Sequence, residues 1–230
     1  MVATIRALKM HGGVKKDDLK KEDLAALEAG MSNLARHIEN MQNFGIVPVV
    51  SINRFSADTD AEIALVRAAC GKLGVDALMA DHWAMGGEGA ADVARAVVKA
   101  AESGKSKLQL LYPDEMPLAD KIRTIAQKIY RAQDIAIDAS VRTQLKNFED
   151  MGYGKLPVCI AKTQYSFSTN PDLKGAPTGH TIPVREVRLS AGAEFIVAVC
   201  GDIMTMPGLP RTPAADSIDI GADGRIVGLF

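Results

Sequence analysis

Aromatic and amide side chains able to bind a flat heterocycle follow two apolar runs of the sequence. Asn53 and Phe55 come after "IVPVVSI", and Asp81 and Trp83 come after "VDALMA". In open parallel sheets, ligands bind beyond the carboxyl ends of the strands. Two aromatic rings at neighbouring strand ends can hold a planar ligand between them, because stacked rings contribute about 1 kcal/mol beyond their buried area.

Each of these residues also has a purely structural interpretation. Asn53 with Asp58 resembles the Asn-Lys-x-Asp element with which GTP-binding folds read a purine, but Arg54 replaces the lysine and the spacer is longer. Asn53 can instead cap a turn, and both Phe55 and Trp83 can pack in the core. The stretch leaves both interpretations open.

Other short motifs give little chemistry. The glycines of "GGEGAAD" can present backbone N–H groups to an anion at a helix start, but Glu88 would repel a phosphate and a tight turn explains them equally well. The "GKS" at Gly104 lacks the leading glycine of a phosphate-binding loop, since Lys99 stands there. The histidines and cysteines have neither metal-site nor nucleophile–base spacing, so no metal site and no catalytic residue is predicted.

The elements that would position the candidate residues alternate between strand and helix. Apolar periodicity predicts helices over 21–45, 59–74 and 91–103, and strands over 46–53 and 75–83. This order is typical of βαβ units, so we expect a parallel sheet with helices on both faces over 21–103. The fold class is therefore α/β.

The chain changes character after residue 103. A connector over 103–117 precedes predicted helices over 118–130 and 140–154. Strands are predicted over 156–163 and 194–203, with a long polar loop over 164–183 between them, and a hairpin is predicted over 217–230. We therefore expect residues 1–110 to form an α/β part and 111–230 to form a smaller helical and α+β region.

Composition excludes several classes of function. The 230 residues carry a net charge of −1, which does not recruit nucleic acid or an acidic membrane surface. The apolar runs are too short to cross a bilayer, and the first twenty residues lack a signal-peptide pattern. The 3 cysteines are far apart, which favours a reducing compartment. We expect a cytoplasmic protein that binds neither nucleic acid nor membrane.

Several segments, in order, resemble one enzyme family. "VATIRALKMHGG", "INRFSADTDAE", "DHWAMGGEGA" and "MTMPGLPRTPAA" are similar to stretches of formate–tetrahydrofolate ligases, and the resemblance covers essentially the whole chain. Members of that family are more than twice as long, and their phosphate-binding loop lies in the N-terminal part. The resemblance therefore implies the C-terminal portion of such a ligase, the remainder of a P-loop NTPase-like fold without its P-loop.

The resemblance also implies a reaction and site residues. The family converts ATP, formate and tetrahydrofolate into 10-formyltetrahydrofolate, ADP and phosphate by way of formyl phosphate, with Mg²⁺ accompanying ATP in the full-length enzyme. Phe55 and Trp83 match the family's pterin-stacking pair. Asn53, Pro207 and Gly208 are expected near the nucleotide. Because the P-loop is absent, we expect the isolated chain to be inactive.

Two alternatives from other classes stay open. The chain can be a non-catalytic module that binds folate or nucleotide, or a part that serves oligomer assembly. The expected partners are formate, tetrahydrofolate and ATP. Homo-oligomerisation and association with a missing N-terminal part are also compatible with the sequence.

Overall fold

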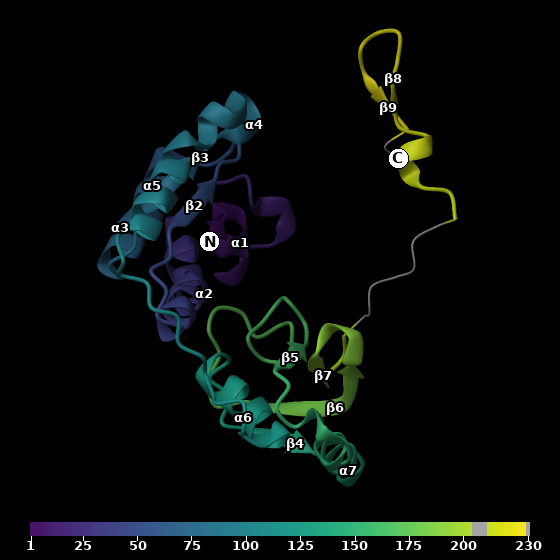
Figure 1. The fold of residues 1–230 in the computed structure, drawn as a ribbon. Coiled ribbons are helices and arrows are strands. Elements are labelled where there is room, and N and C mark those ends of the chain that lie inside the picture. Colours follow the sequence, from purple (N-terminus) through teal and green to yellow (C-terminus); the bar gives the residue numbers. More distant parts are fainter. Residues whose placement is uncertain (204–210, 229–230) are drawn as a thin grey trace.

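A computed structural model describes residues 1–203 and 211–228, and its elements fall into two halves with separate buried clusters (Figure 1). One apolar cluster runs from Ala3 to Val75 and the other from Leu118 to Cys200. The two clusters support the expected division near residue 110, which we keep as a proposal.

The first half is built on a parallel sheet whose strand order is β1-β2-β3. Its elements are β1 (Val2–Ala3), α1 (Ile5–His11), η1 (Lys16–Asp18), α2 (Leu24–Asn43), β2 (Val50–Asn53), α3 (Asp60–Lys72), β3 (Ala77–Ala80), α4 (His82–Met85), η2 (Gly86–Ala90) and α5 (Ala91–Glu102). α1, α2 and α3 bury their apolar faces in the same cluster as β2.

The second half contains a mixed sheet of order β4-β6-β7-β5, in which only the central pair, β6 and β7, is antiparallel. Its elements are α6 (Leu118–Lys128), β4 (Asp134–Ile137), α7 (Ala139–Phe148), a π-helical turn η3 (Glu149–Tyr153), β5 (Val158–Ala161), β6 (Thr181–Ser190), η4 (Ala191–Ala193) and β7 (Phe195–Cys200). η5 (Ala214–Asp216) and the hairpin of β8 (Asp219–Ile220) and β9 (Ile226–Val227) follow, and Figure 1 shows this hairpin apart from both sheets.

The coarse fold class is confirmed: helices flank parallel and mixed sheets. The five predicted helices are present, and the hairpin turns where "GADG" predicted it, with Gly224 at a φ of 75°. β2 begins only at Val50, two residues after Pro48, which has no N–H to donate to a sheet.

Two predicted elements had wrong bounds, and several other elements, β6 among them, were not predicted. The strand expected over 75–83 ends at Ala80, and the next residues turn into α4. β1, α1 and β4 were not predicted. The loop expected over 164–183 stops at Thr181, where β6 begins.

Polar groups on α2 join the two halves. Arg36 is buried and donates to the backbone carbonyl groups of Lys128 and Ile129, and Asn40 donates to Ile129 as well. These carbonyl groups belong to the last residue of α6 and to its C-cap, so they lack helical partners and accept from α2 instead. The contact fixes α2 against the second half.

Candidate functional site

The two strand ends singled out in the sequence lie side by side. β2 and β3 are parallel, and their register places Asn53 opposite Ala80. The Arg54 N–H donates to the Ala80 carbonyl at 3.1 Å, which extends the pairing one residue further. The loops that carry Phe55 and Trp83 therefore leave the same carboxyl edge of the sheet.

Phe55 is held by its own loop. The Asp58 carboxylate accepts from the Phe55 N–H at 2.8 Å, and the Asp58 N–H donates to the Phe55 carbonyl at 3.0 Å. Asp58 is buried, and this burial raises the pKa of its carboxyl group, although the bond from Phe55 opposes the rise. Thr59 then caps α3 with a reciprocal bond pair to Glu62. The tight loop leaves the Phe55 ring 38% exposed.

Arg6 covers one face of that ring. Its guanidinium carbon lies 4.9 Å from the centre of the Phe55 ring, a cation–π geometry. α1 supplies this residue from the strand β1 side of the sheet. Sequence analysis missed Arg6, because nothing in the sequence predicted α1.

Trp83 lies on the short helix α4 and is 89% exposed. The interpretation of Trp83 as a core residue is therefore wrong. Exposure of so large an apolar surface is unfavourable in water, by about 25 cal/mol for each Å². A ring left in this position can bind a ligand or another surface without any rearrangement of the core.

The glycine-rich turn after α4 serves close backbone packing. A Cβ at Gly89 would lie 2.4 Å from the Asp81 carbonyl oxygen, and the Gly89 carbonyl accepts from the Asp81 N–H at 2.9 Å. Gly86 adopts a φ of 59°, which favours glycine. The turn thus fixes the base of α4, as the tight-turn interpretation expected.

An ion pair joins the two loops at the sheet edge. Arg54 follows β2 and Asp81 follows β3, and their charged groups lie 3.6 Å apart. Both side chains are partly exposed, so the pair adds little stability. Its effect is to bring the Phe55 loop and the base of α4 together while leaving polar groups near both rings.

The structure brings Asn53, Phe55 and Trp83 to one edge. Asn53 is half-buried as the last residue of β2. Pro207 and Gly208 lie outside the described residues.

In the part of the chain that is described, no group of three His, Cys, Asp or Glu side chains can hold a metal ion. No helix among those residues has the length and hydropathy needed to cross a membrane.

The sheet edge therefore carries two exposed aromatic side chains, Phe55 and Trp83, and two arginines, Arg6 and Arg54. Side chains of these types can stack and form hydrogen bonds.

Known proteins match the chain along its whole length. The formate–tetrahydrofolate ligase family profile matches residues 1–230. Formate–tetrahydrofolate ligases of Maricaulis maris, Granulibacter bethesdensis and Pelagibacter ubique are 60%, 58% and 56% identical to it over 230 residues. All of this chain is covered, but only 41%, 40% and 41% of those relatives. The coverage is consistent with the expected C-terminal portion. The chain thus belongs to the formate–tetrahydrofolate ligase family.

Proposed function

We propose that this chain supplies the folate-stacking part of an ATP-dependent ligase that forms 10-formyltetrahydrofolate. In the proposed reaction a formate oxygen attacks the γ-phosphorus of ATP, which releases ADP and leaves formyl phosphate. The folate amine then attacks the formyl carbon, and phosphate departs with the bonding electrons. Phosphorylation is needed because formate itself has no good leaving group.

The observation that carries the proposal is the exposure of Trp83 beside the half-exposed Phe55 at one sheet edge. A pterin between the two rings would bury apolar surface on both of its faces. Arg6, on the ring of Phe55, would add positive charge next to the electron-rich heterocycle. In this role the protein holds the folate amine in position for attack.

The nucleotide assignment rests on family resemblance. We propose Asn53, Pro207 and Gly208 as residues near ATP, in a P-loop NTPase-like fold whose phosphate loop lies outside this chain. The described residues do not fit a Mg²⁺ site of their own, since they contain no cluster of three ligating side chains.

The cellular setting and the partners are proposals of the same kind. We propose that the protein acts in the cytoplasm on formate, tetrahydrofolate and ATP. We further propose that it works either as a homo-oligomer or in association with the remainder of the ligase. A non-catalytic folate-binding module is the second candidate function, because the rings at the sheet edge support binding without any phosphate loop.

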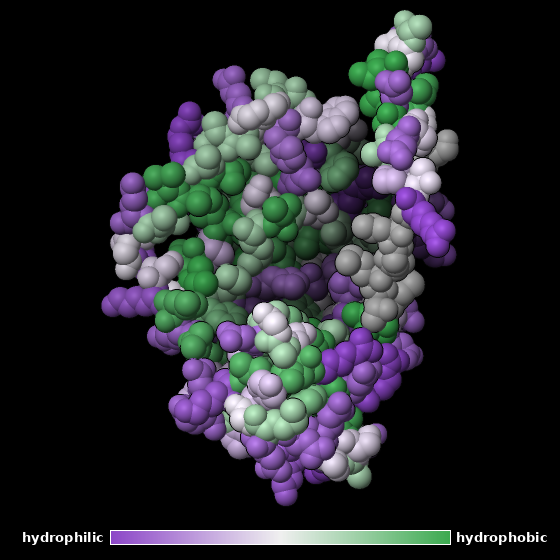
Figure 2. Space-filling view, turned by 45° about the vertical axis from the view of Figure 1, so that its right-hand side comes forward, coloured by the Kyte–Doolittle hydropathy of each residue, from purple (hydrophilic) through white to green (hydrophobic). Residues whose placement is uncertain are grey.

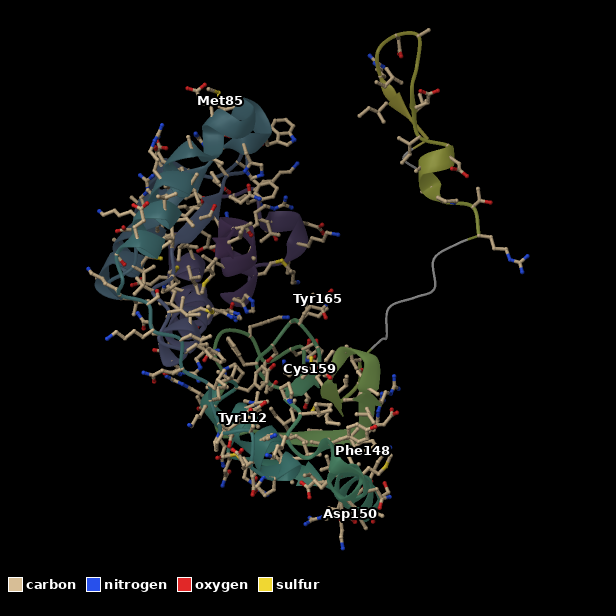
Figure 3. All side chains as sticks on the ribbon, viewed as in Figure 1. Met85, Tyr112, Phe148, Asp150, Cys159 and Tyr165 are labelled. Atoms are coloured by element: carbon tan, nitrogen blue, oxygen red, sulfur yellow. The ribbon has the colours of Figure 1, made fainter. Side chains whose placement is uncertain are left out.

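Replacement of the exposed indole tests the stacking role. We expect Trp83→Ala to weaken tetrahydrofolate binding by about 1–3 kcal/mol, the range measured for one base stacked on one aromatic side chain. Isothermal calorimetry of the chain measures this change. Met85→Ala is the matched control, because Met85 is exposed on the same helix, at its outer end in Figure 3. Equal affinities of Trp83→Ala and the unaltered chain would contradict the proposal.

A further inference from the structure

A cavity lies between the two halves, away from the sheet edge that carries Phe55. It has a volume of about 300 Å³, and Figure 2 shows the molecule hollowed between its upper and lower parts. His11 and His37 line it from the first half, and Tyr130 and Lys162 line it from the second. Arg6 and His11 stand near opposite ends of α1, so this cavity is separate from the proposed pterin site.

The cavity presents hydrogen-bond donors. Lys162 donates to the carbonyl groups of Thr163 and Ser166, which leaves the third N–H of its ammonium group for another acceptor. His11 accepts from the Gly175 N–H through Nδ1 at 3.2 Å, so its neutral form carries the proton on Nε2 and donates there. The hydroxyl group of Tyr130 stays protonated, since burial raises its pKa to about 12.

The charge around the cavity is positive. Among the described residues that line it, none is an aspartate or a glutamate. Burial lowers the pKa of His11, and the nearby charges of Lys174 and His37 lower it further. Burial also lowers the pKa of His37, as do Arg36 and Lys162. Burial is the main reason why the imidazoles lose their protons, and the neighbouring cations add to its effect.

We propose that this cavity binds a small oxyanion, a phosphate or carboxylate group, with Lys162 as the charged donor and the two imidazoles as hydrogen-bond donors. An oxyanion accepts several hydrogen bonds at once and supplies the negative charge that the lining lacks. The His37 ring packs against Phe167 at a tilt of 43°, with ring centres 4.7 Å apart. The source is either free phosphate or the carboxylate end of a larger ligand.

The pH dependence follows from the groups that face Lys162. Burial lowers the pKa of Lys162 to about 8, with a small opposing effect from Cys200. Lys162 also lowers the pKa of His180, after burial, and its ammonium lies 5.0 Å from the ring centre of Tyr130. The anion binds the protonated form of Lys162, so affinity falls as the pH rises above about 8.

Histidine ring NMR of the whole chain tests the proposal. Inorganic phosphate and a γ-linked triglutamate peptide are titrated separately at constant ionic strength. We expect saturable shifts of the His11 and His37 resonances with at least one of them, while the exposed His82 is unchanged. If only phosphate shifts these resonances, the cavity is a phosphate site. If only the peptide shifts them, it is a carboxylate site. No saturable shift with either, or parallel shifts of His82, overturns the proposal.

Two variants make the assignment specific. Lys162→Gln should weaken binding about ten- to a hundredfold, the range for loss of one charge-assisted hydrogen bond. Lys155→Gln removes the same charge from an exposed site and should have no effect. If Lys162→Gln does not fold, His37→Phe is the second variant. It keeps an aromatic ring against Phe167 but removes the N–H donor of the imidazole, so it should also weaken binding. Equal losses in Lys155→Gln and Lys162→Gln refute the site. Because Trp83 fluorescence reports folate stacking separately, failure of either proposal is distinguishable from failure of the other.

Discussion

The ion pair of Lys9 and Glu62 organises the first half from its interior. Both side chains are 0% exposed, and the charged atoms lie 2.8 Å apart. Glu62 also accepts from the N–H groups of Asp23 and Thr59, and Lys9 donates to the Lys21 carbonyl. A buried pair of this kind is favourable only because its remaining hydrogen-bonding groups are satisfied. The pair thus ties α1, the start of α2 and the start of α3 together behind the Phe55 loop.

Loss of one partner should be costly. We expect Glu62→Gln to reduce the free energy of unfolding by about 3–5 kcal/mol, because it leaves the Lys9 ammonium buried without a counter-charge. Urea unfolding measures the change. The double variant Lys9→Met, Glu62→Leu should be less destabilised than Glu62→Gln. A double variant as unstable as the sum of its single variants would contradict the pairing.

The same carboxylate gives the stability a pH dependence. Burial alone would raise the pKa of Glu62, but the hydrogen bonds from Lys9, Thr59 and Asp23 outweigh it and leave that pKa below its ordinary value of 4.5. The contribution of Glu62 is therefore present above that value and is lost as the pH falls through the lower folded-state pKa.

Individual residues differed in how far the sequence could predict them. Phe55 and Trp83 were candidates because aromatic rings are unusual in polar loops at strand ends. The sequence suggested Asp58 as part of a base-reading element, whereas its carboxylate accepts a hydrogen bond from the backbone of Phe55. Lys162 lies in the cavity between the two halves and belongs to no sequence motif. The histidines and the tyrosine that line the cavity with it come from segments distant in the sequence.

At the scale of elements, the glycine turn after α4 positions Trp83. Gly89→Ala would place a methyl group against the Asp81 carbonyl group, whereas a Cβ at Gly87 meets open space. We expect Gly89→Ala to destabilise the protein by about 1–3 kcal/mol, as overpacking does, and to weaken folate binding as α4 shifts. Gly87→Ala is the matched control in thermal unfolding and binding assays. Similar behaviour of the two variants would show that the close approach does not matter.

Elements with a regular period could be predicted from the sequence, and interrupted ones could not. α2 and α3 repeat apolar residues at helical spacing and have clear capping residues, Asp23 and Thr59. β6 contains Pro183, and its register shifts between Val184 and Glu186, which breaks the period-two alternation. β1, with only 2 residues, is too short to carry a periodic signal.

The whole molecule combines exposed aromatic rings at one sheet edge with a sequence that lacks the phosphate-binding motif. Its 230 residues contain no Gly-x-x-x-x-Gly-Lys-Ser/Thr loop. Phosphoryl transfer depends almost entirely on positioned cationic and backbone donors. The arrangement of the two halves could not be predicted from the sequence either. Arg36 joins them through the backbone carbonyl groups of Lys128 and Ile129, which any residue type would supply.

We therefore expect the chain alone to form no 10-formyltetrahydrofolate from ATP, formate and tetrahydrofolate at a useful rate. A coupled ADP-release assay with the purified chain measures this, with a full-length ligase of the family as the positive control. Robust formate-dependent turnover by the chain alone would show that the missing loop is not required.

The central claim is that Phe55 and Trp83 hold a pterin, and the fluorescence of Trp83 tests it most directly. Trp83 is the only tryptophan in the chain, so the emission has one source. We predict that tetrahydrofolate quenches it saturably after correction for inner-filter absorption, and that Phe55→Ala shifts the titration to higher folate concentration. Emission that stays unchanged while calorimetry detects folate binding would place the pterin elsewhere and contradict the account.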